Sequence, residues 1–269
     1  MSGFIVPFKK PTPNIAGFLD VMNGNKLPDK PPIVEFLIDD TLMKPILEEM
    51  IGRKWVDVSF DKCHIGSKMN FSKENTSVIN SWLDNQISFW YHMGYDFIRL
   101  EIGLNFPVIT YSTTDTAEGN RNNNRVWQSL TEGVIKDWDD YNNYPWPKIT
   151  DNNFYVHNYI CEHLPDGMGF ITCHSGGVFE HTSRLLGYEN LCLNLTQDPL
   201  LVVAVINKVG ELIYQYYKIL LKFEGISAIL QGDDLGFNTQ TLISPKDLKE
   251  YFLPWHKKIA DLCHKNNRP

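Results

Sequence analysis

The sequence predicts an α/β protein whose parallel sheet is the first part of a (β/α)8 barrel of the TIM-barrel type, truncated before its last strands. Four short apolar runs alternate with helical patterns, which is the order of a parallel sheet covered by helices. A complete barrel needs eight strands in about 250 residues or more, whereas this chain spends 269 residues on four. The chain stops after a helix, where a strand is due, so we expect an incomplete barrel rather than an open four-stranded sheet.

Composition and charge exclude several classes of protein. Hydrophobic residues make up 43% of the chain and charged residues 21%, which excludes a disordered chain. The net charge of −7 argues against a general nucleic-acid binder, which needs a basic face. No apolar run reaches the ~20 residues of a membrane span, and the N-terminus lacks a signal-peptide pattern, so a cytoplasmic location is expected. The five cysteines include no C-x-x-C pair, so no disulfide framework is expected.

Residues 1–30 are expected to form an N-terminal helical extension. Thr12 can cap its helix, Pro13 suits the first helical position, and Gly24 suits the end. The apolar run at 33–38 follows two prolines and predicts the first buried strand of the sheet.

Three further cycles of helix and strand follow the first strand. The clearest helix begins with a capping Asp198 and Pro199, carries apolar residues at a 3.6-residue spacing, and ends at Gly225. The segment 105–151 is too long for a simple connection and is expected to be a loop that folds over the site. The other expected elements are a helix over 78–93, a strand over 96–102, a helix over 153–163, a strand over 168–173, a helix from Val178, a strand over 226–230, and a last helix from Ser244 that Pro254 kinks.

Asp233 and Asp234 are the first candidate site residues. They follow the strand at 226–230, and a parallel barrel places its chemistry at the carboxyl ends of its strands. A carboxylate there can accept N–H bonds from a tetrapyrrole or attract a cationic substrate. Neighbours in an extended segment point to opposite faces, so the two are not expected to share a proton. The alternative is a turn and helix cap beside Gly232.

The turn from His174 through Ser175, Gly176 and Gly177 is the second candidate. Small residues that lead into a helix expose N–H groups suited to an anion such as a carboxylate. His174 titrates near neutral pH and could move a proton. The alternative is a glycine turn with a hydrogen-bonded histidine.

Charged residues on the first two strands are weaker candidates. Arg99 and Glu101 face the same side of the strand at 96–102, and two charges on a buried strand indicate the barrel interior or its mouth. Glu35 and Asp39, on the first predicted strand, indicate the same location less strongly. Helix capping is the preferred interpretation of Asp39 and its neighbour Asp40.

Histidines and cysteines give no recognisable metal motif. Cys173, His174, Glu180 and His181 match no familiar zinc spacing, so structural roles are favoured for them. His256 and His264 are expected to be solvated helix positions.

Two parts of the chain resemble the uroporphyrinogen decarboxylase superfamily. The segment 244–259 contains the string S-P-x-x-L-x-x-Y-x-x-P-W-x-K-x-I and follows the G-D-D-L-G segment 232–236. The S-G-G-V-F-E segment 175–180 and the L-G-Y-E segment 186–189 resemble the middle helix pair of the family. The resemblance covers roughly 31–269, which we expect to be one barrel domain that is incomplete at its C-terminus.

The resemblance implies one of two enzyme types on a (β/α)8 barrel. One decarboxylates uroporphyrinogen without a cofactor, and the other transfers methyl groups between substrates, corrinoid proteins and thiols with zinc. The arginine-rich N-terminal loop of the decarboxylases is absent before Lys54, Ser183 lies near the position of their tyrosine, and Glu101 replaces their pyrrole-binding aspartate. The H-x-C-G zinc element of the methyltransferases would be expected just after Pro269.

The resemblance therefore favours a methyltransferase-type enzyme that acts on a corrinoid or a small methylated substrate. Its expected pocket is lined by Asp233, Asp234, Glu101 and His174, and its zinc ligands would follow Pro269. A corrinoid protein is the expected partner, and the two open sheet edges predict a homodimer. The alternatives are a uroporphyrinogen decarboxylase and a non-catalytic fragment that binds a tetrapyrrole or corrinoid.

Overall fold

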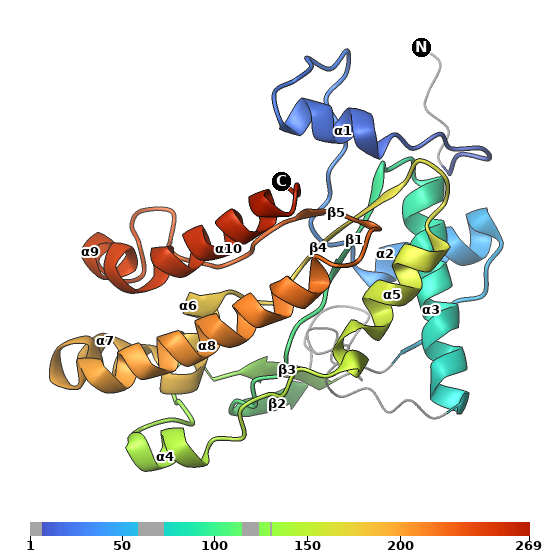
Figure 1. The fold of residues 1–269 in the computed structure, drawn as a ribbon. Helices are drawn as coiled ribbons and strands as arrows, with labels where there is room; N and C mark the ends of the chain where they lie inside the picture. Colours follow the sequence, from blue (N-terminus) through green and yellow to red (C-terminus); the bar gives the residue numbers. More distant parts are fainter. Residues whose placement is uncertain (1–6, 59–72, 115–123, 130) are drawn as a thin grey trace.

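The computed structural model describes residues 7–58, 73–114, 124–129 and 131–269, and it is drawn in Figure 1. Its helices and helical turns are α1 (Ile15–Met22), α2 (Asp40–Pro45), η1 (Ile46–Ile51), α3 (Lys73–His92), α4 (Trp138–Asn143), η3 (Asp151–Phe154), α5 (Tyr155–His163), α6 (Val178–Leu186), α7 (Tyr188–Gln197), α8 (Pro199–Leu220), α9 (Pro245–Asp247), η4 (Leu248–Phe252) and α10 (Leu253–Lys265). Its strands are β1 (Phe97–Glu101), β2 (Thr110–Thr114), β3 (Asn124–Gln128), β4 (Gly169–Cys173) and β5 (Ile226–Ile229).

A parallel sheet of β1, β4 and β5, in that spatial order, forms the centre of the described part of the chain. In the β1–β4 ladder, Arg99 lies opposite Ile171 and Glu101 lies opposite Cys173. The strands are parallel, so their carboxyl ends meet at one edge of the sheet. The α/β prediction is confirmed, and three of the four predicted strands pair as expected.

The two faces of the sheet are covered differently. Ile98, Phe170 and Ile226 belong to the main core, which also contains the apolar faces of α3, α5 and α8. On the opposite face, Phe18 of α1 packs with Phe97 in a small separate cluster. Ile15 N donates to Gly167 O (2.9 Å), just before β4, so α1 covers the amino ends of the strands. The candidate site lies at the opposite edge of the sheet, where the carboxyl ends of the strands meet.

Helix α8 confirms the strongest helix prediction. The Asp198 side chain accepts a hydrogen bond from Leu201 N, and Pro199 occupies the first turn. Ten residues of the helix are buried, among them Tyr216 and Tyr217, each with no exposed surface. Burial of one such large apolar side chain contributes roughly 1.5–3 kcal/mol. Figure 1 shows α8 beside α10, and the two helices are in contact.

The predicted strand at 33–38 is wrong. The segment has no ladder, and Ile33, Val34, Phe36 and Leu37 are all at least half exposed. It passes beside β1, with the Phe36 ring 4.1 Å from the Arg99 guanidinium carbon. An apolar run is buried as a strand when it pairs with neighbouring strands and is covered on both faces. The segment 33–38 does not pair with β1, which is therefore an edge strand of the described sheet.

Three smaller expectations also change. The cap of α1 is Asn14, whose side chain accepts from Gly17 N at 2.9 Å, and not Thr12. The segment 105–151 is more than a loop, because it contains the antiparallel β2–β3 pair and α4. The last helix begins at a capping Ser244 as predicted, but it is divided by the π-helical turn η4 just before Pro254, which cannot donate a helical N–H bond. No described helix is long and apolar enough to cross a bilayer.

Candidate functional site

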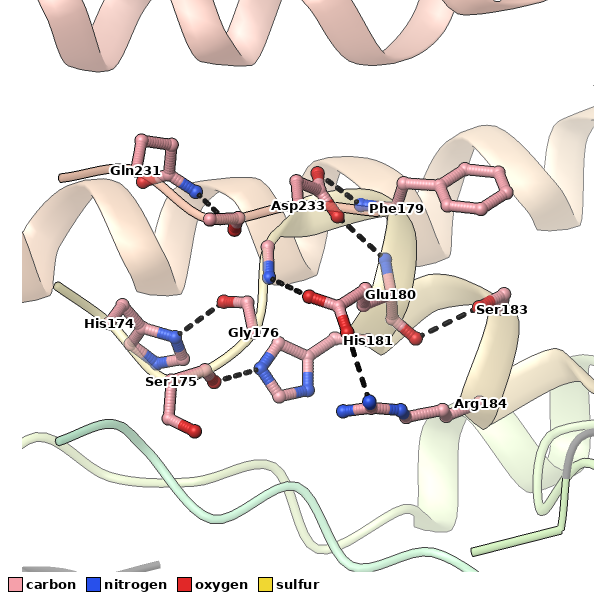
Figure 2. Close-up of polar contacts among 12 residues, drawn as sticks. His174, Ser175, Gly176, Phe179, Glu180, His181, Ser183, Arg184, Gln231 and Asp233 are labelled. Carbon is pink, nitrogen blue, oxygen red and sulfur yellow. Dashed lines mark hydrogen bonds and ion pairs between the residues drawn. The ribbon is translucent and has the colours of Figure 1, made fainter. Parts of the chain in front are cut away.

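Three loops meet at the carboxyl edge of the sheet, one after each parallel strand. They are the segment 102–106 after β1, the turn 174–177 after β4, and the segment 231–234 after β5. Figure 2 shows the contacts of the second loop with helix α6, and those of Asp233, from the third loop, with the first residues of the same helix. Parallel α/β proteins bind their ligands at this edge, which makes it the candidate site.

His174 joins two of these loops. Its Nε2 accepts a hydrogen bond from Leu104 N (2.9 Å), and its Nδ1 lies 2.9 Å from Gly176 O. A nitrogen that accepts carries no proton, so these bonds fix the neutral ring with its proton on Nδ1. Because both ring nitrogens bind backbone atoms and the side chain is buried, His174 holds the loop after β1 against the turn.

His181 holds the same turn from helix α6. Its Nε2 donates to Ser175 O over 2.9 Å, as Figure 2 shows. Gly176 has a φ of +79°, and a Cβ there would lie 2.8 Å from His181 Nε2. Both the left-handed conformation and the close approach therefore require glycine.

Asp233 is buried at the N-terminus of α6. Its two carboxylate oxygens accept hydrogen bonds from Phe179 N and Glu180 N, each at 3.0 Å. Its Oδ2 also lies 2.8 Å from His256 Nε2, and only 1% of the side chain is exposed. A carboxylate at this end complements the helix dipole. Asp233 therefore caps a helix, which was the alternative to a catalytic role in the sequence analysis. The helix that it caps is α6, which lies more than 50 residues before Asp233 in the sequence.

Glu180 closes the turn from the other side. Its Oε2 accepts from Gly177 N (3.1 Å), and its Oε1 pairs with Arg184 Nη2 (3.0 Å). Burial raises the pKa of the Glu180 carboxyl above its usual value, and the neighbouring Arg184 opposes that shift. The group is only 20% exposed, so its charge depends on the Arg184 pair.

Arg99, Glu101 and Cys173 form a second cluster at the adjoining ends of β1 and β4. Arg99 Nη2 donates to Glu101 Oε1 (2.6 Å), and Cys173 Sγ lies 3.5 Å from the same oxygen. Burial and the Glu101 charge raise the pKa of the Cys173 thiol far above its usual value. A raised pKa keeps the Cys173 thiol protonated near neutral pH, and a protonated thiol is a poor nucleophile.

The structure brings most of the candidate residues together and separates the rest. The turn 174–177 and Asp233 form one connected group, and Arg99 and Glu101 lie on the strand next to it. Asp234 is exposed at the same edge. Glu35 is exposed on the segment beside β1, and Asp39 caps α2 by accepting from Thr41 N (2.8 Å), as preferred for it.

His256 and Tyr217 are site residues that the sequence reasoning missed. The prediction of a solvated His256 is wrong, because its ring binds the buried Asp233. Tyr217 Oη accepts a hydrogen bond from His174 N (2.8 Å) at the base of the turn. Both partners lie far away in the sequence, so no local pattern could have found them. The bond from Gly177 N to the Glu180 side chain, by contrast, is local, and the three-residue spacing of a glutamate after the start of a helix could have indicated it.

The described residues contain no group of three or more His, Cys, Asp or Glu side chains placed to hold a metal ion. Cys161, Cys173, Cys192 and Cys263 are free thiols, and Cys63 lies outside the described residues.

Comparisons with known proteins show the fold but no family. No family model matches the chain, and no curated protein matches its sequence. Among solved structures, a methyltransferase from Methanosarcina mazei is similar, with a TM-score of 0.59 and 11% sequence identity. The similarity covers 93% of this chain and 67% of that chain. At this identity the likeness supports a TIM-barrel-like α/β fold, of which the described residues supply three parallel strands.

Proposed function

We propose that this protein is a methyltransferase-type enzyme whose substrate binds at the carboxyl edge of the β1–β4–β5 sheet. The observation that carries the proposal is the fold similarity, over 93% of the chain, to a structure described as a methyltransferase. The sequence resemblance of 175–189 and 232–259 to the uroporphyrinogen decarboxylase superfamily, which includes methyltransferases, points the same way.

In this proposal the site residues have two kinds of role. Glu101, which is partly exposed, and Asp234, which is exposed, lie at this edge and contact a corrinoid or a small methylated substrate. In the turn 174–177, His174 N and Gly177 N are already bound by Tyr217 and Glu180, which leaves the Ser175 side chain as the polar group that the turn offers at this edge. Asp233 and His174 are positioning residues, because their hydrogen bonds hold one backbone segment or side chain against another.

Zinc has no place among the described residues. They offer no metal-binding cluster of His, Cys, Asp or Glu side chains, so zinc has no step among them. Zinc in the methyltransferase branch activates a thiol by lowering its pKa. In the proposal, residues after Pro269 would supply its ligands.

The pairing of the arginines favours methyl transfer over uroporphyrinogen decarboxylation. Arg99 is paired with Glu101, and Arg184 is paired with Glu180. A substrate with several carboxylate arms needs more cationic partners than these two side chains offer within the described part of the site.

The test follows a methyl group in the full-length protein from its own source, under anoxic conditions. Methylcob(III)alamin and a thiol are supplied. The methyl carbon–cobalt bond breaks, cobalt keeps the electron pair as cob(I)alamin, the carbon bonds to sulfur, and the thiol proton goes to solvent. The absorbance of cob(I)alamin and the mass of the thioether are recorded. We expect turnover that falls at least about tenfold in Glu101→Gln and stays unchanged in Glu189→Gln, an exposed carboxylate on α7.

Other outcomes distinguish the alternatives. Conversion of uroporphyrinogen to coproporphyrinogen, without methyl transfer, would establish the decarboxylase. An absorbance shift on titration with a corrinoid, without any turnover, would leave a binding protein.

A further inference from the structure

A groove of about 710 Å³ lies between helices α8 and α10, which Figure 1 shows side by side. Its charged lining consists of Lys218, Lys222, Lys257, Lys258, Lys265 and Asp261. All five lysines are exposed, on a chain whose net charge is −7. None of these residues belongs to the three loops of the candidate site, so the groove is a separate surface.

The lysines occupy facing stripes of the two helices. Lys218 and Lys222 are four residues apart at the end of α8, and Lys258 and Lys265 are seven residues apart on α10. Both spacings place side chains on one face of a helix. At a helical rise of 1.5 Å per residue, the positive charges are spread over roughly 10 Å along the groove.

The positive charge of the groove is only partly neutralised. Lys257 pairs with Asp261 (2.6 Å), and Lys258 pairs with Glu211 on the rim (3.2 Å). The lysines that form no ion pair within the described part of the chain are Lys218, Lys222 and Lys265. The carbonyl ends of the two helices offset about one further charge, so an excess of roughly two positive charges remains.

Lys258 is held in place before any ligand binds. Its Nζ lies 4.3 Å from the centre of the Tyr214 ring and 4.4 Å from that of Trp255. Contact with two aromatic faces stabilises an ammonium group and restricts its motion. A charge that is already positioned costs less conformational entropy when a partner binds.

The form of the groove indicates which kind of anion fits it. Compact phosphate sites use helix N-termini and backbone N–H groups, whereas both helices end here with their carbonyl groups. The lining contains lysines and no arginine, so it lacks the planar fork that binds one oxyanion through two bonds. A long nucleic acid would extend beyond the groove over a chain of net negative charge. Charges spread along two helices match several carboxylates that are one or two helical turns apart.

We propose that the groove between α8 and α10 binds an acidic segment of a partner protein. Carboxylates of that segment pair with Lys218, Lys222 and Lys265, and its apolar side chains contact Tyr214 and Leu262 of the lining. The inference does not rest on the proposed function, because the groove lies outside the loops of the candidate site.

The test uses a synthetic peptide as the probe and the full 269-residue chain. The peptide carries glutamates at four-residue spacing in an alanine background, and a second peptide has glutamine in place of each glutamate. Fluorescence anisotropy of the labelled peptides measures binding at low and at physiological salt. We expect the acidic peptide to bind, its affinity to fall as the salt concentration rises, and the glutamine peptide not to bind.

The triple variant Lys218→Gln, Lys222→Gln, Lys265→Gln locates the binding surface. Exposed ion pairs each change an affinity a few-fold at most, so loss of all three should weaken binding about tenfold. The matched control changes the net charge equally at three exposed lysines outside the groove and should keep the wild-type affinity. Its substitutions are Lys44→Gln, Lys136→Gln and Lys148→Gln.

Several results would overturn the proposal. The absence of peptide binding at low salt would show that the groove is no docking site, and an equal loss in the control triple would assign binding to the net charge of the chain. Tighter binding of oligodeoxythymidylate would indicate a nucleic-acid groove, and displacement of the peptide by an equal concentration of pyrophosphate would indicate a compact phosphate site. If the groove triple does not fold, Lys222→Gln alone, beyond the end of α8, should weaken binding about twofold to threefold. Unchanged affinity in that variant would contradict the assignment.

Discussion

Asp233 and Asp234 are neighbours in the sequence but lie in different surroundings. Asp233 is 1% exposed and binds two backbone N–H groups of α6 and the ring of His256, whereas Asp234 is exposed. The chain cannot turn both side chains inward in an extended segment, because successive side chains point to opposite faces. The same substitution at the two positions therefore compares the stability contribution of a buried carboxylate with that of an exposed one.

Asp233→Asn is expected to lower the free energy of unfolding by about 2 kcal/mol, because it removes a charged acceptor from three hydrogen bonds. Asp234→Asn should change it by less than about 0.5 kcal/mol. Urea unfolding of both variants measures the two values. Equal losses in the two variants would show that Asp233 does not hold α6 in solution.

His157 predicts a pH dependence of stability. The residue is fully buried in α5, and burial lowers the pKa of its imidazole from 6.5 to about 3. Between these values the unfolded chain binds a proton that the folded chain does not, so stability falls as the pH falls from 6.5 toward 3. His157→Gln should reduce the slope of unfolding free energy against pH in this window by up to about 1.4 kcal/mol per pH unit.

Chemical unfolding between pH 4 and 7 measures this slope. His163→Gln, at the exposed end of the same helix, is the matched control and should keep the wild-type slope. An unchanged slope in His157→Gln would mean that His157 is accessible to protons in the folded protein.

At the scale of elements, the turn 174–177 is fixed by several independent contacts. Helix α6 begins at this turn, Asp233 caps that helix from the loop after β5, and His174 ties the turn to the loop after β1. The loops after all three parallel strands therefore depend on one short segment. Close packing leaves no room for added atoms at its glycines.

Gly177→Ala tests this arrangement. A Cβ at Gly177 would lie 2.0 Å from Asp233 Cγ, so Asp233 or the turn must move. The expected loss of stability is about 1–3 kcal/mol, and the thermal midpoint should fall accordingly. Gly232→Ala is the control, because no atom lies within 4 Å of its Cβ position, and it should be neutral or slightly stabilising. A neutral Gly177→Ala would show that Asp233 does not pack against the turn.

At the scale of the whole molecule, the sheet has two outer strands in the described structure. β1 is accompanied by the unpaired segment 33–38, and β5 is bordered by the end of α10, where Ile229 N donates to Pro269 O (3.1 Å). The segment 33–38 also exposes Ile33, Val34, Phe36 and Leu37. Strand edges beside exposed apolar side chains favour association with another chain.

We therefore expect this 269-residue chain to self-associate at micromolar concentration. Sedimentation velocity over a dilution series measures the oligomeric state. A species that stays monomeric at every concentration and melts cooperatively would contradict the prediction.

The local elements of this protein were predictable because their determinants are close together in the sequence. The cap and stripe of α8, the Ser244 cap and the apolar runs of β1, β4 and β5 act over a few residues, and each appears where it was predicted. The candidate residues after these strands were also predictable, since parallel strands bring their carboxyl ends to one edge.

Tertiary structure alone decided which partners these residues have. The bond between Asp233 and His256, the contact of His174 with Tyr217 and the exposure of 33–38 depend on segments far apart in the chain. An apolar run becomes a buried strand only where neighbours cover it, and a carboxylate becomes a helix cap only where a helix N-terminus reaches it. The sequence by itself determined the elements and the edge where they meet, and packing between distant segments decided which side chains face solvent, a cavity or one another.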